Sequence, residues 1–145
     1  MNPILKKYNE VNAFGELLGL KLNVIKPGHV EYRMEITEHH LSNPAAAHGG
    51  ALAAMMDGIL GVAALSLAAE KHRLVSTEEF KINYYAPIKF GDKLIGEGNV
   101  IFEGNRLISS EGVIYCENEN MKMVCRGLGT FNSYPVEKNI LLSKE

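Results

Sequence analysis

The feature that most constrains the fold is the run from Ala51 to Ala69, "ALAAMMDGILGVAALSLAA", in which Asp57 is the only ionisable side chain. At a rise of about 1.5 Å per residue, this run forms a helix about 28 Å long. The helix is apolar on nearly every side, which is typical of a helix buried inside a protein rather than of one on its surface. We therefore expect the rest of the chain to enclose it.

The same run is long enough to be considered as a membrane span. It is rich in alanine and glycine and has few strongly apolar side chains. Asp57 in the middle of a bilayer would cost a few kcal/mol. The flanking segments read as amphipathic strands that need a partner layer. We therefore expect a core helix and no membrane association.

The segments around the helix show the alternation of half-buried strands. Val30, Tyr32 and Met34 alternate with charged residues, which predicts a strand with one dry face. In the first part of the chain we expect one or two short helices over 4–18, a hairpin of strands over 20–27 and 30–36, and a loop over 39–47. The buried helix follows over 49–71. After it we expect a meander of strands over 74–85, 94–102, 107–116 and 121–131, and a loosely held polar tail from Tyr134. A helix that is apolar on every side needs a sheet curved around it. The expected fold class is α+β, in a single domain over 1–145, with about five to six antiparallel strands around the central helix.

Charge and cysteine content exclude several classes of function. The formal net charge is -2, which argues against a nucleic-acid-binding protein and leaves anionic small molecules as ligands. Cys116 and Cys125 have no CxxC spacing and no nearby histidine pattern, so we expect reduced cysteines and no metal site. The first residues lack an apolar core of signal-peptide length, so the expected location is cytoplasmic.

The triplet His48-Gly49-Gly50 stands at the start of the helix. The first N–H groups of a helix have no partner within the helix and lie at the positive pole of its dipole. Glycine lets a ligand approach that backbone, and one such donor to a developing oxyanion is worth about 3 kcal/mol. A glycine-rich start chosen for tight packing explains the triplet equally well.

Asp57 lies eight residues beyond Gly49 in the same helix. Apolar surroundings tend to raise the pKa of an acid, which suits a general base or a nucleophile near neutral pH. A buried acid held by hydrogen bonds, or paired across an interface, is the alternative. The run offers no cation within four residues, which favours function. Since the helical rise separates the two residues by about 12 Å, a site that uses both must be shared between two subunits.

Other polar residues are weaker candidates. Thr77 begins a strand and either orients a water molecule or is simply a β-branched strand residue. Lys89 and Arg106 lie in loops, where they either meet phosphates or remain solvated; together with Gly50 we take them as candidate substrate-binding positions. Ser66 has no GxSxG context, so a serine triad is not supported.

Four stretches, "NPAAAHGGALAAMMDGILGVAA", "STEEFKINYYAPIKFGDKLIGEGNVI", "GNRLISSEGVIY" and "KMVCRGLGTF", carry a family resemblance. They resemble the hotdog-fold acyl-CoA thioesterases of the phenylacetate-degradation type, over about residues 14–131. An acid nine residues after the histidine of HGG is fairly specific to this group. The resemblance implies a central helix wrapped by a curved antiparallel sheet, homodimers joined edge to edge (often as dimers of dimers), and active sites at the dimer interface.

The resemblance also implies roles for single residues. The Gly49 N–H would polarise the thioester carbonyl, while Asp57 of the partner subunit would activate water or attack directly. The remaining implied roles are a loop amide near the site for Asn43, shaping of the turn for His48, a water-holding hydroxyl for Thr77 and a contact with coenzyme A phosphates for Arg106. No cofactor is implied.

Two other functions remain open. The first is a hotdog hydratase or dehydratase, a group that resembles this chain but carries a D-x-N-P-x-H pattern in the same loop. In "LSNPAAAH" Leu41 stands in place of the acid, and the histidine comes two residues late, which argues against this function. A non-catalytic acyl-CoA-binding protein is the other alternative. The favoured interpretation is an acyl-CoA thioesterase that needs no metal, with an acyl chain that the sequence does not specify.

Overall fold

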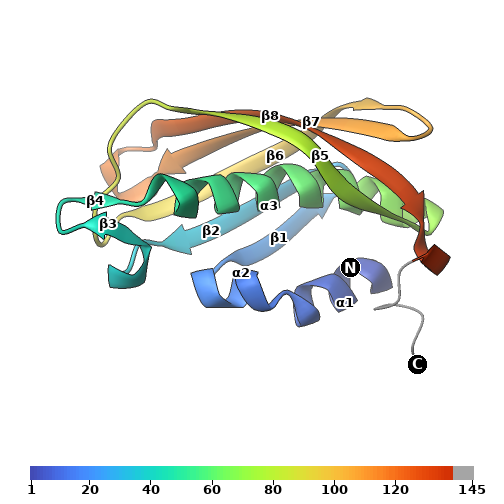
Figure 1. Ribbon diagram of the computed structural model, residues 1–145, viewed down its shortest axis with the longest axis horizontal. Coiled ribbons are helices and arrows are strands. Elements are labelled where there is room, and N and C mark those ends of the chain that lie inside the picture. The colour runs from blue at the N-terminus through green and yellow to red at the C-terminus, as the bar shows by residue number, and fades with distance from the viewer. Residues whose placement is uncertain (139–145) are drawn as a thin grey trace.

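The computed structural model describes residues 1–138 and is shown in Figure 1. Its helices and strands are α1 (Pro3–Val11), α2 (Ala13–Leu18), β1 (Lys21–Lys26), β2 (His29–Glu35), β3 (Leu41–Asn43), β4 (Ala46–Ala47), α3 (Gly49–Ala68), β5 (Arg73–Tyr84), β6 (Lys93–Glu103), β7 (Leu107–Cys116) and β8 (Lys122–Pro135). Short 3-10 helices cover Glu38–His40, Ala69–Lys71, Glu117–Glu119 and Val136–Lys138.

The six long strands form one antiparallel sheet that curves around α3, in the order β1-β2-β6-β7-β8-β5. Figure 1 shows α3 lying along the inner face of this sheet. This arrangement confirms the expected hotdog fold, with six strands and one central helix.

The expected meander is only partly correct. β6, β7 and β8 are consecutive neighbours, but β5 lies beyond β8 at the edge of the sheet, and β6 pairs with β2 instead. The loop after β5 returns the chain to β2, where the Ile36 N–H donates to the Asp92 carbonyl at 2.9 Å. Periodicity within a strand carries no information about its neighbours, so the sequence did not reveal this order.

Two shorter segments also differ from the expectation. The expected loop over 39–47 contains the small hairpin of β3 and β4, in which the Ala45 N–H donates to Asn43 Oδ1 at 2.8 Å. Tyr134 is not part of a loose tail, because it pairs with Leu74 in the extension of β8 along β5. Pro135 ends β8 and Val136–Lys138 form a short 3-10 helix, while residues 139–145 of the expected tail lie outside the described residues.

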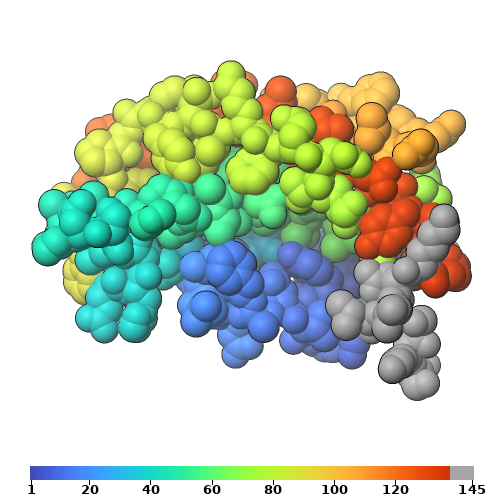
Figure 2. Space-filling view, viewed as in Figure 1, coloured from blue at the N-terminus to red at the C-terminus, as the bar shows by residue number. Residues whose placement is uncertain are grey.

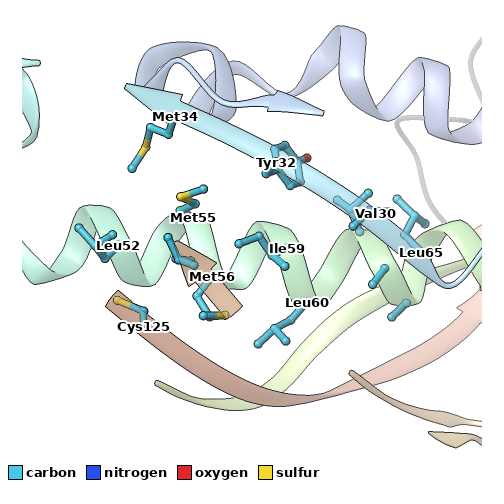
Figure 3. Close-up of a cluster of buried hydrophobic side chains, with 14 of the residues drawn as sticks. Val30, Tyr32, Met34, Leu52, Met55, Met56, Ile59, Leu60, Leu65 and Cys125 are labelled. Atoms are coloured by element: carbon cyan, nitrogen blue, oxygen red, sulfur yellow. The ribbon is translucent and has the colours of Figure 1, made fainter. Parts of the chain in front are cut away.

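The core is built on α3. Figure 3 shows Met55, Ile59 and Leu60 between the helix and the sheet, and each is fully buried. Strand glycines allow the helix to lie this close: a Cβ on Gly98 would lie 2.6 Å from the carbonyl oxygen of Ile59. The sheet therefore contacts the helix backbone itself at this point.

Length and composition alone would allow the segment Gly49–Lys71 to cross a membrane. However, 67% of its most apolar window is buried inside the protein. That burial is the pattern of a core helix, and the sheet covers one side of α3.

The N-terminal helices cover part of the side of α3 that the sheet leaves open. Leu5 of α1 is buried, and the Asn2 side chain donates to the Ala69 carbonyl at 3.3 Å, which ties the start of α1 to the end of α3. In Figure 2 a strip of α3 remains visible between β5 and these two helices. That strip is where the candidate site lies.

Candidate active site

Asp57 meets a polar partner from the sheet. The Thr77 hydroxyl, on β5, donates to Asp57 Oδ1 at 2.9 Å. A bulge in the pairing of β5 with β8 falls between Thr77 and Glu79, and bulges of this kind redirect side chains. The structure thus brings together two residues that the sequence suggested separately.

A pocket of about 350 Å³ opens beside Asp57. It lies between α1, α3 and the paired strands β5 and β8. Its polar groups include Asp57, Ser76 and Thr77, while aliphatic and aromatic side chains form most of its remaining walls. Largely apolar concavities with a few convergent polar groups are typical of small-molecule sites.

Tyr8 lines this pocket, and Tyr32 lies beside Tyr8 and Gly58. The Tyr8 hydroxyl, on α1, accepts from Asn12 Nδ2 at 3.3 Å, and burial together with the charge of Asp57 raises the pKa of Tyr8. Tyr32 is buried, and its hydroxyl has no hydrogen-bond partner among residues 1–138. Burial and the neighbouring Tyr8 raise the pKa of Tyr32 far above its usual range, so both phenols stay neutral near pH 7. The spacing of α1 indicated only an apolar helix face, and the sequence carried no signal that Tyr8 lies near Asp57.

The HGG triplet forms the first turn of α3. His48 Nδ1 accepts from the Gly50 N–H at 2.8 Å, which caps the helix and occupies that donor. Among the described residues the Gly49 N–H has no acceptor, and Gly49 is exposed. Of the two glycines, Gly49 is therefore the one that offers a free backbone donor at the positive end of the helix.

Tyr84 supports this turn from β5, because its hydroxyl donates to the Gly49 carbonyl at 2.6 Å. The pattern of its strand predicted core packing for Tyr84 rather than a place in the site. Its position on the same strand face as Phe80 and Ile82 was the available signal, but that signal did not distinguish a site residue from a core residue. A second hollow of about 330 Å³, bordered by Tyr84, Tyr85 and Pro87, lies beside Gly49.

The remaining candidates lie at opposite ends of α3. Asn43 belongs to the hairpin near the helix start, where its side chain holds the turn at Ala45. Lys89 lies at the same end and forms an ion pair of 3.3 Å with Glu119. Arg106 lies at the other end, where its carbonyl accepts from the Ser133 N–H at 2.6 Å. One chain therefore does not gather Asn43, Lys89 and Arg106 into one site.

Asp57 and Gly49 are also apart within one chain. They are eight residues apart on α3, and the helical rise makes this about 12 Å. β5 connects the two places, with Thr77 beside Asp57 and Tyr84 beside Gly49. Its outer edge pairs with no strand in the described part of the chain.

No group of three or more histidine, cysteine or acidic residues suited to a metal is found within residues 1–138.

Comparison with known protein families and with curated proteins relates this chain to thioesterases. A family model described as the thioesterase superfamily matches residues 45–122. Human acyl-coenzyme A thioesterase 13 is 26% identical over 109 residues, which are 74% of this chain and 76% of that protein.

Solved structures share the fold. A hypothetical thioesterase from Streptococcus pneumoniae TIGR4, solved with coenzyme A, has a TM-score of 0.72 and 23% identity over 80% of this chain and 86% of its own. The PaaI protein of the phenylacetic acid degradation operon of E. coli has a TM-score of 0.78 and 19% identity, and the match covers 90% of each chain.

Proposed function

The chain belongs to the thioesterase superfamily and is a thioester hydrolase, and we propose that its substrate is an acyl-coenzyme A cleaved at Asp57. The observation that carries the proposal is the Asp57–Thr77 pair at the edge of a largely apolar pocket. The curated relative named as an acyl-coenzyme A thioesterase, and the structural neighbour that holds coenzyme A, support this choice of substrate.

In the proposed reaction Asp57 acts as a general base. Thr77 occupies one carboxylate oxygen and orients the group, so the other oxygen can take a proton from a water molecule. The resulting hydroxide attacks the thioester carbonyl carbon, and the carbonyl electrons move onto its oxygen. Collapse of this oxyanion breaks the carbon–sulfur bond, and the departing coenzyme A thiolate takes up the proton that Asp57 had accepted. The products are the free acid and coenzyme A, and Asp57 is again ionised.

The oxyanion needs a donor, and the free Gly49 N–H is suited to this role. Because Gly49 is about 12 Å from Asp57 along one helix, we propose that the donor comes from the partner subunit of a homodimer. Antiparallel pairing of two β5 edges, with Thr77 of one chain opposite Tyr84 of the other, would bring Asp57 of one subunit beside Gly49 of the partner subunit. Hydrogen bonding of each edge strand would stabilise such a dimer.

A complementation experiment tests the shared site. Asp57→Asn removes the carboxylate, and Gly49→Val places a branched side chain where the substrate must approach the backbone N–H. Each variant is expected to be inactive alone, since each disables one half of every site. In random mixed dimers, one site in each heterodimer contains both native residues, so activity should return to about a quarter of the wild-type value. No recovery after subunit exchange, with heterodimers demonstrated by mass spectrometry, would place both residues in one chain and contradict the proposal.

Substrate class is tested by release of free thiol from a panel of acyl-coenzyme A esters. Turnover that disappears in Asp57→Asn supports hydrolysis at this carboxylate. Stoichiometric binding without thiol release, by a folded protein, would identify a binding protein and refute the proposal.

A further inference from the structure

We propose that the pocket beside Asp57 holds the acyl group, and that α1 gives it the length of an unbranched aliphatic chain of about eight to ten carbons. The inference rests on the proposed thioesterase function and adds the substrate class. Three features of the pocket support it: the direction in which the pocket runs from Asp57, its length, and the elements whose side chains line it.

The pocket has a defined direction. One end holds Asp57 and Thr77, where the thioester carbonyl must lie for hydrolysis. From there the floor follows one face of α3 through Gly58 and Gly61 to Leu65. The two glycines leave this floor without side chains, so a chain can lie along the helix.

The length follows from the helix geometry. Asp57 and Leu65 are eight residues apart, which is about 12 Å of helical rise. An extended alkyl chain advances about 1.3 Å per carbon, given carbon–carbon bonds of about 1.5 Å, so about nine carbons span that length. An aryl group attached through a single methylene is shorter and would leave the far end of the pocket empty.

The outer wall comes from α1. Ile4, Tyr8 and Val11 line the pocket and share one face of the helix, at the spacing of i, i+4 and i+7. The bond from Asn2 to the Ala69 carbonyl places the start of α1 at the end of α3. Ile4 therefore lies at the end of the pocket that is remote from Asp57, while Tyr8 lies near the carboxylate, which perturbs its pKa.

The walls between these two ends match an alkyl chain. Beyond Asp57 and Thr77, most lining residues are apolar, with Val62 from α3 and Leu74 and Phe131 from the sheet. No lysine or arginine lines the pocket in the described part of the chain, so nothing there would balance a charged terminus. Burial of each additional methylene is favourable, so the preference should rise with chain length until the pocket is full.

The test compares saturated acyl-coenzyme A esters of increasing length, together with the phenylacetyl ester. We expect kcat/KM of the wild type to rise from butyryl to octanoyl or decanoyl and to fall for longer chains. Ile4→Trp shortens the pocket and should lower kcat/KM for decanoyl at least about tenfold while leaving butyryl within about twofold. Ile4→Ala should move the optimum to longer chains.

Leu17→Trp is the matched control, because Leu17 is 77% exposed on α2 and does not line the pocket; it should leave the profile unchanged. An optimum at phenylacetyl, a flat profile, or the same profile in both Ile4 variants as in the wild type would overturn the inference. Binding of decanoic acid, measured by calorimetry and weakened by Ile4→Trp, tests the pocket without turnover. Absence of hydrolysis therefore refutes the proposed function, whereas unaltered acid binding refutes this inference alone.

Discussion

The Thr77 hydroxyl on β5 donates a hydrogen bond of 2.9 Å to the carboxylate of Asp57 on α3. This contact joins the edge strand of the sheet to the only acid in the apolar run. The site therefore lies between α3 and the edge strand of the sheet.

Replacement of Asp57 by asparagine is the most direct test of the site. Asparagine keeps the size of the side chain but cannot accept a proton from water, so kcat should fall by about 10² to 10⁴. Thermal unfolding and oligomeric state should match the wild type. Glu16→Gln, at an exposed acid on α2, is the control and should keep full activity.

Thr77→Val removes the hydroxyl while preserving the branched shape. A hydrogen bond to a charged group contributes about 1.5–3 kcal/mol, so kcat should fall at least about tenfold. Thr77→Ser retains the donor and should recover most of that loss. Equal activity of the valine and serine variants would show that the hydroxyl does not orient Asp57.

Tyr84→Phe removes the donor that holds the Gly49 carbonyl. If Gly49 stabilises the oxyanion, the effect should be on kcat, by about three- to tenfold, with KM nearly unchanged. Tyr85→Phe on the adjacent position is the matched control, since no hydrogen bond of its hydroxyl is found within residues 1–138. A change in KM alone would assign Tyr84 to substrate binding instead.

Gly98→Ala tests the close approach of sheet and helix. In an open strand, alanine would stabilise the chain relative to glycine by about 0.5–1 kcal/mol. Here the new Cβ would lie 2.6 Å from the Ile59 carbonyl oxygen, which belongs to rigid helix backbone. Overpacking should therefore reverse the sign and destabilise the fold by about 1–3 kcal/mol in chemical denaturation. Asn99→Ala at the next position should be close to neutral.

Alkaline pH should destabilise the protein through the buried thiol of Cys125. Burial raises the pKa of Cys125 from 9.0 to about 11. Between these values the unfolded chain has lost the thiol proton and the folded chain keeps it, so the free energy of unfolding falls as pH rises. The loss is about 2 kcal/mol at pH 11 and approaches about 3 kcal/mol at higher pH, at about 1.4 kcal/mol per pKa unit.

Urea denaturation at pH 8, 9, 10 and 11 measures this loss. Cys125→Ala should show a smaller decrease over the same range, because the group that titrates is absent. The other groups whose pKa is raised, Cys116 and the tyrosines Tyr8, Tyr32 and Tyr84, should account for part of the decrease that remains. An identical pH dependence in the variant would show that Cys125 does not contribute.

Much of the fold was predictable from the sequence because its signals are local. Alternation at Val30, Tyr32 and Met34 marked a strand, and a helix apolar on every side required a sheet around it. The same locality made Asp57 and Gly49 recognisable, since one is the lone acid of the helix and the other stands at its start. Their separation along one helix follows from the rise per residue alone.

Which distant segments contact these residues depends on the tertiary structure. Thr77 reaches Asp57, Tyr84 reaches Gly49 and α1 closes the pocket because β5 lies at the sheet edge beyond β8 and the N-terminal helices cover the open side of α3. Such contacts depend on strand order and on the packing of whole elements, which periodicity does not encode. Local patterns therefore predicted the long elements and the acid, whereas three-dimensional packing supplied the surroundings that make the acid a candidate site.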